Sequence, residues 1–165
     1  MLDPNADPFA APQNTDNSNP TLFGAKDASD LNWVQLLNAY SCTECGRCSS
    51  VCPANQTGKL LSPRKVMMDT RDRIEEIGKN KNENKYLLGN YITKEELWAC
   101  TTCNACTDAC PINLDPLSII IDLRRYLVME ESAAPSELNN MFSNVENNGA
   151  PWQFPAADRL KWIEE

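Results

Sequence analysis

The chain has 165 residues and a formal net charge of −8, with eight cysteines and no histidine. Residues 31–130 hold twelve acidic and twelve basic residues, so no basic stripe is available to neutralise nucleic-acid phosphates or to bind an anionic membrane surface. No apolar run reaches the length of a membrane-spanning helix. The lack of histidine removes the usual general base of enzymes and the histidine ligands of Rieske centres.

The first 29 residues are rich in aspartate, asparagine and proline and contain few large apolar side chains. Such a segment cannot bury enough apolar surface to fold by itself. Residues 1–29 are therefore predicted to be a disordered acidic linker, with Leu22 and Phe23 as its points of attachment to a domain. A chain that opens on a linker also suggests a piece of a longer protein.

From position 30 onward, apolar residues recur with the helical period and do not alternate as in a strand, which predicts an all-α fold. Ser29 can cap the first helix, and Ser62 and Asp115 each stand before a proline that suits a first helical turn. Thr93 and Glu96 form a capping-box pattern at the start of another helix. The predicted helices cover residues 30–40, 62–78, 93–99, 115–130 and 135–148, with a last one near the C-terminus. Between them, residues 79–91 are expected to form a polar excursion anchored by Tyr86, Leu87 and Leu88.

The apolar positions of these helices predict which faces are buried. They are Leu31, Val34, Leu36 and Leu37 in the first helix, Val66, Met67, Ile74 and Ile77 in the second, and Leu138, Met141, Phe142 and Val145 in the fifth.

One twelve-residue pattern, C-x2-C-x2-C-x3-C-P, occurs twice and contains all eight cysteines. The first copy spans residues 42–53 and the second spans residues 100–111. Gly46 of the first copy matches Asn104 of the second, and these two residue types adopt positive φ most readily. Each copy is therefore predicted to form a tight loop whose backbone N–H groups point at one anion.

This spacing is the one that bacterial two-cluster ferredoxins use for iron–sulfur ligation, in which the fourth cysteine binds the other cluster. It predicts two [4Fe-4S] clusters, each completed by the opposite copy. The first cluster is assigned Cys42, Cys45, Cys48 and Cys110, and the second is assigned Cys100, Cys103, Cys106 and Cys52. The long helical segment between the copies favours an α-helical ferredoxin over the small β-α-β kind.

Two other interpretations of the cysteines account for less of the pattern. A four-cysteine zinc site needs only two C-x2-C pairs, so the third cysteine and the C-P ending of each copy would be unexplained. A disulfide framework would require export and would not repeat a metal-binding spacing, and a reducing compartment fits better. A zinc-stabilised interaction module without a redox role stays as the alternative.

With both motifs complete, the chain resembles the helical di-cluster ferredoxin modules of heterodisulfide reductase small subunits and of the anaerobic glycerol-3-phosphate dehydrogenase iron–sulfur subunit. The resemblance covers about residues 30–130, and residues 95–131 look especially like bacterial membrane-associated relatives of heterodisulfide reductase. It divides the chain into the linker 1–29, a helical di-cluster domain 30–131 and C-terminal helices 132–165 that pack on it.

The resemblance implies an electron-transfer module that carries single electrons within a larger oxidoreductase, either heterodisulfide reductase-like or quinone-linked, without a substrate site of its own. It also implies a cytoplasmic location at the membrane face. The implied redox partners are a cysteine-rich domain, a flavoprotein or a membrane part that holds quinone or haem, and neither nucleic acid nor a direct membrane span is expected.

Basic residues gather around the first motif, namely Arg47, Lys59, Arg64 and Lys65, whereas Asp108 lies inside the second. These bases either form an ordinary solvated surface, or they offset the negative charge of the first cluster and raise its reduction potential relative to the second. Both interpretations stay open from the sequence.

Overall fold

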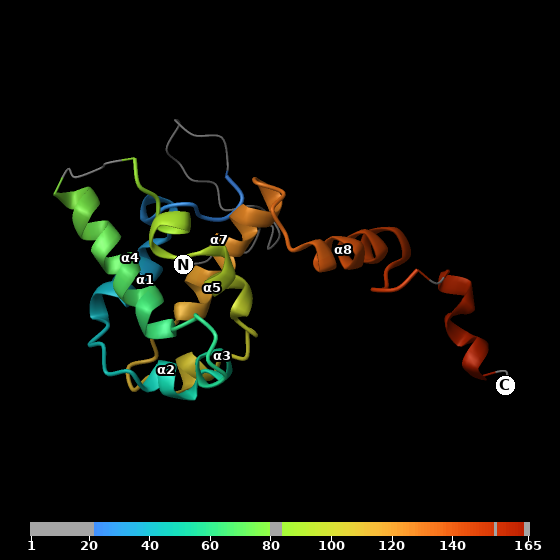
Figure 1. The fold of residues 1–165 in the computed structure, drawn as a ribbon, viewed down its shortest axis with the longest axis horizontal. Helices are drawn as coiled ribbons and strands as arrows, with labels where there is room; N and C mark the ends of the chain where they lie inside the picture. The colour runs from blue at the N-terminus through green and yellow to red at the C-terminus, as the bar shows by residue number, and fades with distance from the viewer. Residues whose placement is uncertain (1–21, 80–83, 154, 164–165) are drawn as a thin grey trace, which may run out of the picture. The chain divides into compact units, whose positions relative to one another are not determined.

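The computed structural model describes residues 22–79, 84–153 and 155–163 of the chain. It divides into two compact units, residues 1–130 and residues 131–165 (Figure 1). Within the described ranges the regular structure is helical, and the β-structure there amounts to one isolated bridge between Leu88 and Ile92. The predicted all-α class is confirmed.

The helices of the first unit lie close to their predicted positions. In chain order they are α1 (Trp33–Ser41), α2 (Arg47–Val51), α3 (Pro53–Gln56), α4 (Pro63–Gly78), α5 (Lys94–Ala99), α6 (Ala105–Asp108) and α7 (Pro116–Met129), with short turns at Ala28–Asp30 (η1) and Leu87–Tyr91 (η2). Three of the four predicted caps are present, because the side chains of Ser62, Thr93 and Asp115 each accept a hydrogen bond from a backbone N–H in the first turn that follows.

The core of this unit forms where α1, α4 and α7 pack against one another. Its largest apolar contributions come from Met67 of α4 and from Ile119, Leu123 and Leu127 of α7, which are fully buried. Each such side chain contributes about 1.5–3 kcal/mol to folding through its removal from water. At the other end of the unit, the short helices α2 and α6 contact each other. Since α2 and α6 belong to the two cysteine motifs, this contact brings the motifs together.

Helix α1 departs from the sequence prediction. It begins at Trp33, and Asn32 rather than Ser29 caps it in a capping box with Gln35. Val34 and Leu37, which were expected to be buried, are 44% and 55% exposed, whereas Gln35 is buried. The glutamine can be buried because its amide donates to Asp122 Oδ2 at 2.6 Å and its carbonyl accepts from the Asn32 N–H.

The ordered unit begins earlier than the predicted boundary at residue 30. Ala25, Asp27 and Ala28 are buried, and the Ala25 N–H donates to the carbonyl of Asp122 at 3.0 Å. The Asp27 carboxylate forms a bidentate pair with Arg73 of α4 at 2.8 and 2.7 Å. Residues 24–29 therefore belong to the fold, because this pair gives an acidic segment a buried partner. Residues 1–21 of the predicted linker lie outside the described residues.

The predicted faces of α4 and of the following excursion are partly confirmed. Val66 and Met67 are buried, but Ile74 and Ile77 are only half-buried. Of the three predicted anchors, Leu87 and Leu88 are buried, whereas Tyr86 is exposed and its ring lies under the ammonium of Lys26.

The second unit contains α8 (Ser136–Asn148) and a 3-10 segment (Ala156–Ile163). Gly149 ends α8 with φ of 63°, as the predicted Asn-Gly stop requires. Met141, Phe142 and Val145 lie on the expected apolar side of α8 but are exposed. The packing of residues 132–165 on the di-cluster domain stays a prediction.

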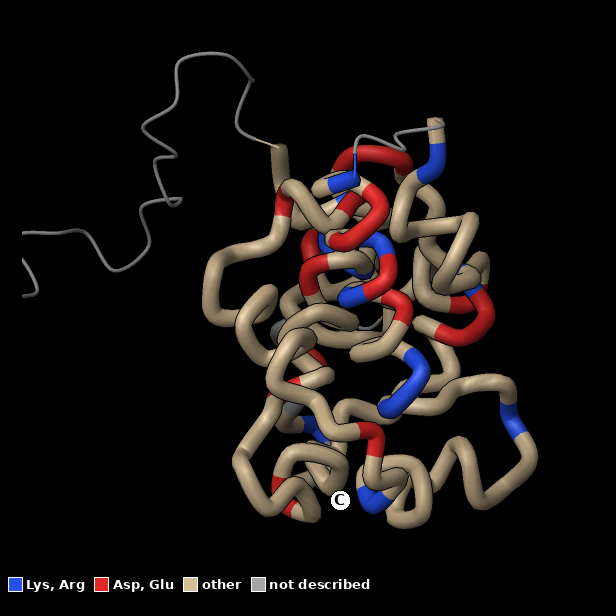
Figure 2. The backbone as a smooth tube through the Cα atoms, turned by 90° about the vertical axis from the view of Figure 1, so that its left-hand side faces the viewer, with Lys and Arg blue, Asp and Glu red and all other residues tan. Residues whose placement is uncertain are grey.

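Charged side chains are distributed rather than segregated. Figure 2 shows basic and acidic positions interspersed along the backbone, and several of them pair, as Arg71 does with Glu44 at 2.6 Å and Lys65 with Glu96 at 2.7 Å. In the part of the chain that the structure describes, no helix has the length and apolar character needed to cross a membrane.

Candidate metal centre

The two cysteine loops have the same local backbone. Each follows the end of a helix, α1 or α5, and each turns into a short helix at a residue with positive φ, Gly46 at 82° or Asn104 at 63°. The predicted Gly/Asn match is confirmed. A second matched pair, Glu44 at φ 59° and Thr102 at φ 55°, was not predicted, because glutamate and threonine carry no sequence signal for this conformation. Left-handed backbone at non-glycine residues costs about 1–3 kcal/mol and concentrates at functional sites.

The second loop directs polar hydrogens at its sulfur atoms. The Thr102 N–H donates to Cys100 Sγ at 3.4 Å. The pKa of the Cys103 thiol is lowered by the Ala105 N–H and further by the Thr101 hydroxyl. Donors of this kind stabilise thiolate, which is the form that binds metal. Donors therefore reach the sulfurs of Cys100 and Cys103, and the expectation that the loop amides point at one cluster anion stays a prediction.

Burial acts in the opposite direction on the two inner cysteines. Burial raises the pKa of the Cys48 thiol, and it raises the pKa of Cys106 to about 11. Desolvation disfavours the thiolate when no cation is near. These two sulfurs therefore become thiolates most readily when a metal supplies the compensating positive charge.

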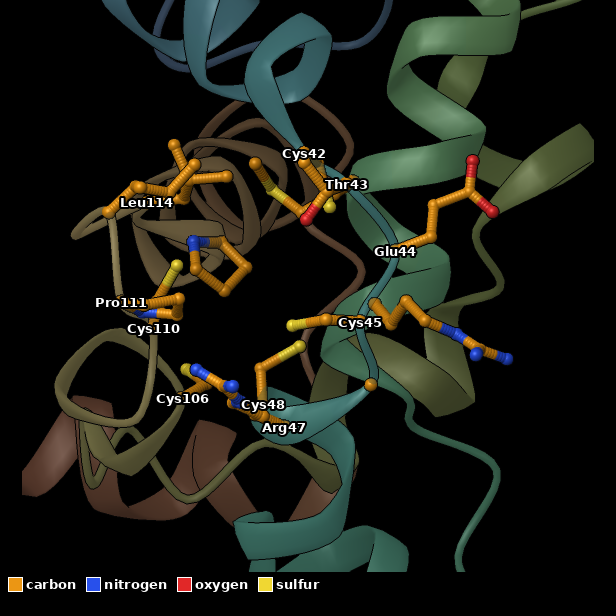
Figure 3. A pocket seen from close by; sticks show the side chains of 15 residues that line it. Cys42, Thr43, Glu44, Cys45, Arg47, Cys48, Cys106, Cys110, Pro111 and Leu114 are labelled. Carbon is orange, nitrogen blue, oxygen red and sulfur yellow. The ribbon is translucent and has the colours of Figure 1, made fainter.

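A cavity of about 90 Å³ lies between the two motifs. Cys42, Cys45 and Cys48 of the first motif line it, and Cys106 and Cys110 reach it from the second. Figure 3 shows the sulfurs of Cys45 and Cys48 turned toward the same space, with Cys110 across from them. The rest of the lining consists of Thr43, Glu44, Gly46, Arg47, Arg64, Met67, Pro111, Ile112, Leu114 and Pro116.

The size, lining and donor set of this cavity fit an iron–sulfur cluster. Its volume is several times the roughly 10–15 Å³ that one water molecule needs. Buried Met67, Leu114 and Pro116 give it an apolar wall, which excludes water from a cluster. No three cysteine, aspartate or glutamate side chains of the described residues converge as a single-ion site requires.

The structure brings some predicted site residues together and leaves others apart. Cys110 shares the cavity with Cys42, Cys45 and Cys48, as the cross-ligated first cluster requires. Cys52, Cys100 and Cys103 lie outside this cavity. Cys52 is buried at the junction of α2 and α3, Cys100 follows α5, and Cys103 is exposed in the second loop. The assignment of ligands to the two clusters stays a prediction.

The basic residues near the first motif separate into two kinds. Arg47 and Arg64 line the cavity. The ammonium of Lys65 instead binds Glu96 and Asp69 at 2.7 and 3.0 Å, so carboxylates already compensate its charge. If basic residues tune the first cluster, Arg47 and Arg64 are placed to do so and Lys65 is not.

Helices α1–α7 and two cysteine loops that meet at one cavity define a helical dicluster ferredoxin. A family model described as "4Fe-4S dicluster domain" matches residues 38–114. Residues 38–114 thus match the 4Fe-4S dicluster family, and the eight cysteines within them imply two [4Fe-4S] clusters.

Curated relatives agree with this family. The chain is 35% identical to the "Probable iron-sulfur-binding oxidoreductase FadF" of Bacillus subtilis and 31% identical to the "EtfAB:quinone oxidoreductase" of Syntrophomonas wolfei. Both alignments cover 87% of this chain, but they cover only 25% of the first relative and 24% of the second. It is also 34% identical over 100 residues to one component of the CoB-CoM heterodisulfide reductase of Methanosarcina acetivorans, covering 60% of this chain and 52% of that protein. The chain is thus an electron-transfer module that spans about a quarter to a half of these relatives.

Proposed function

We propose that the module passes single electrons between two redox partners within a larger oxidoreductase that is quinone-linked or heterodisulfide reductase-like. The observation that carries the proposal is the cavity in which Cys110 of one motif meets Cys42, Cys45 and Cys48 of the other. A group bound by both motifs joins the two halves of the unit. Two clusters held by such interlocked loops lie close enough to form one electron path.

The proposed ligand sets follow the cross-ligated pattern. The first cluster takes Cys42, Cys45, Cys48 and Cys110, and the second takes Cys100, Cys103, Cys106 and Cys52. The contact between α2 and α6 supports this exchange, because Cys48 lies in α2 and Cys106 in α6. Cys106 also faces the first cavity, which supports a short separation between the two clusters.

When bound, the clusters supply the one-electron chemistry, and the protein supplies ligands, dipoles and a dry shell. Met67 and Leu114 exclude water from one side of the first site. The Thr102 N–H stabilises negative charge on Cys100 sulfur, which favours the reduced state. Arg47 and Arg64 place positive charge at the wall of the cavity and are proposed to raise the reduction potential of the first cluster.

The proposed partners follow from the relatives' names. One relative is named for EtfAB and quinone, and another is named as part of a heterodisulfide reductase. We propose that this module likewise lies between a donor such as a flavoprotein and an acceptor that is either a quinone site or a cysteine-rich disulfide-reducing domain. A quinone acceptor would place the module at the membrane surface, and we propose the cytoplasmic side because free thiolate ligands suit a reducing compartment.

Metal analysis of the anaerobically purified chain tests the redox function against the zinc alternative. The proposal expects a brown protein with about eight irons per chain, as two four-iron clusters require. A colourless protein with two zinc ions would support the interaction module instead.

Cysteine variants test the ligand sets. Cys48→Ser and Cys110→Ser are expected to remove the EPR signal of the same cluster. Cys106→Ser is the matched comparison, because Cys106 lines the same cavity but is assigned to the other cluster. Loss of different signals in the Cys48 and Cys110 variants would refute the cross-ligation.

A further inference from the structure

The cationic side chain of Arg124 lies at the end of α5 and has no part in the proposed ligand sets or in the charge around the first cluster. Arg124 of α7 donates from Nε and Nη2 to the carbonyl of Leu97, at 3.1 and 2.5 Å. Its Nη2 also donates to the carbonyl of Cys100 at 2.6 Å. These carbonyls lie in the last turn of α5 and directly after it, and the carbonyl of Leu97 also accepts from the Cys100 N–H at 3.2 Å. The guanidinium thus fixes the point at which the second cysteine loop begins.

The surroundings of Arg124 leave its charge uncompensated by carboxylates. The guanidinium is half-buried and lies 4.9 Å from the centre of the Trp98 ring. Among the residues that the structure describes, no carboxylate forms an ion pair with it. Partial burial of such a cation costs free energy unless an anion lies near it.

The next residue on the same helix shows the ordinary alternative. Arg125 is exposed, and its Nη1 pairs with Asp122 Oδ1 at 3.0 Å. Solvent and a carboxylate therefore screen the charge of Arg125, whereas Arg124 faces the cysteine loop.

We propose that Arg124 is a positioning residue that raises the reduction potential of the second cluster by holding a fixed positive charge beside the loop that begins at Cys100. The inference rests on the proposed function, since it needs a cluster bound through Cys100. Reduction adds one electron to the cluster, and a nearby cation stabilises the reduced form more than the oxidised form. Removal of the charge must then make reduction harder.

A redox titration with dithionite and mediators, followed by EPR, tests this in the holoprotein. Arg124→Gln is expected to lower the equilibrium constant for reduction of one cluster about tenfold, which is ~59 mV for one electron. The other cluster is expected to keep its potential. The matched control Arg125→Gln removes the same charge one residue away and is expected to change both constants by less than about twofold.

Arg124→Lys separates charge from packing, because it keeps the cation but loses the bidentate donors. In this variant, the equilibrium constant for reduction of the second cluster is expected to stay within about threefold of the wild-type value. If the glutamine variant does not retain its clusters, Arg124→Met replaces it as the uncharged variant with the same expected tenfold fall. An unmoved constant in that variant, or a tenfold fall in Arg124→Lys, overturns the proposal.

Two further results would overturn the proposal. With both clusters intact, an unmoved potential in Arg124→Gln, or equal shifts in both clusters, would remove this inference and leave the electron-transfer function standing. Zinc in place of iron in the wild-type protein would overturn the inference and the proposed function together.

Discussion

Replacement of Asp27 by asparagine is expected to destabilise the di-cluster unit strongly. The Asp27 carboxylate accepts two hydrogen bonds from Arg73 and one each from the backbone N–H groups of Ala28 and Leu87. Asp27 is 8% exposed and the Arg73 side chain is 1% exposed. One carboxylate therefore joins the segment before α1, the middle of α4 and the turn at Leu87.

The size of the effect follows from this burial. Removal of one partner from a buried ion pair costs about 3–5 kcal/mol. Glu76 Oε2, which lies 3.7 Å from Arg73 Nη1, still offsets part of the arginine charge, so the lower end of this range applies. With a urea dependence of about 1–3 kcal/mol per molar, the unfolding midpoint of Asp27→Asn should fall by at least about 1 M. The midpoint is measured anaerobically by far-UV circular dichroism, with cluster absorbance followed in parallel.

The direction of the Asp27 pKa shift also predicts how this loss of stability depends on pH. Burial raises the pKa of Asp27, but the hydrogen bonds from Arg73, Ala28 and Leu87 outweigh it and hold the pKa below its ordinary value. A carboxylate with a lowered pKa contributes fully above its unfolded value and loses that contribution only as pH falls through the folded value. The difference between wild type and Asp27→Asn should therefore be the same at about pH 8 and at about pH 5.5.

The matched control is Glu75→Gln, which removes a carboxylate from the same helix. Glu75 pairs with Lys79 at 3.0 Å on the exposed side of α4, so its loss should leave the midpoint unchanged. If Asp27→Asn and Glu75→Gln have equal midpoints, the assignment of residues 24–29 to the fold is wrong.

The loops and the cavity lead to three more predictions. Gly24→Ala should lower the free energy of unfolding by several times the ~1–2 kcal/mol expected for Gly46→Ala. A Cβ at Gly24 would lie 2.4 Å from the Asp122 carbonyl oxygen, whereas the nearest atom to a Cβ at Gly46 is 3.8 Å away. Urea midpoints compare the two variants, and equal losses of stability would contradict the prediction. Arg47→Ala should lower the potential of the first cluster in a redox titration, and two unchanged midpoints would refute its role. Iron chelation should reduce far-UV helicity, since buried Cys52 and Cys106 then lose the metal that joins the motifs; unchanged helicity would show that the clusters are not structural.

Much of the fold was readable from local chemistry. The caps at Ser62, Thr93 and Asp115 were predicted because a side-chain oxygen before a helical run satisfies a free N–H within the same few residues. The buried face of α1 was not, because burial of Gln35 depends on Asp122, which lies 87 positions later. The same holds for Asp27, whose partner Arg73 lies 46 positions away.

The sequence by itself favoured iron–sulfur ligation over a zinc site, since the type and spacing of eight cysteines carry that preference without reference to the rest of the chain. Only the tertiary structure placed Cys106 in the cavity that Cys110 shares with the first motif, and Arg124 against the carbonyl of Cys100. The physical reason is the separation in sequence between the residues involved. Ligand spacing is a property of one short loop, whereas a shared cavity and an uncompensated charge depend on which helices pack together.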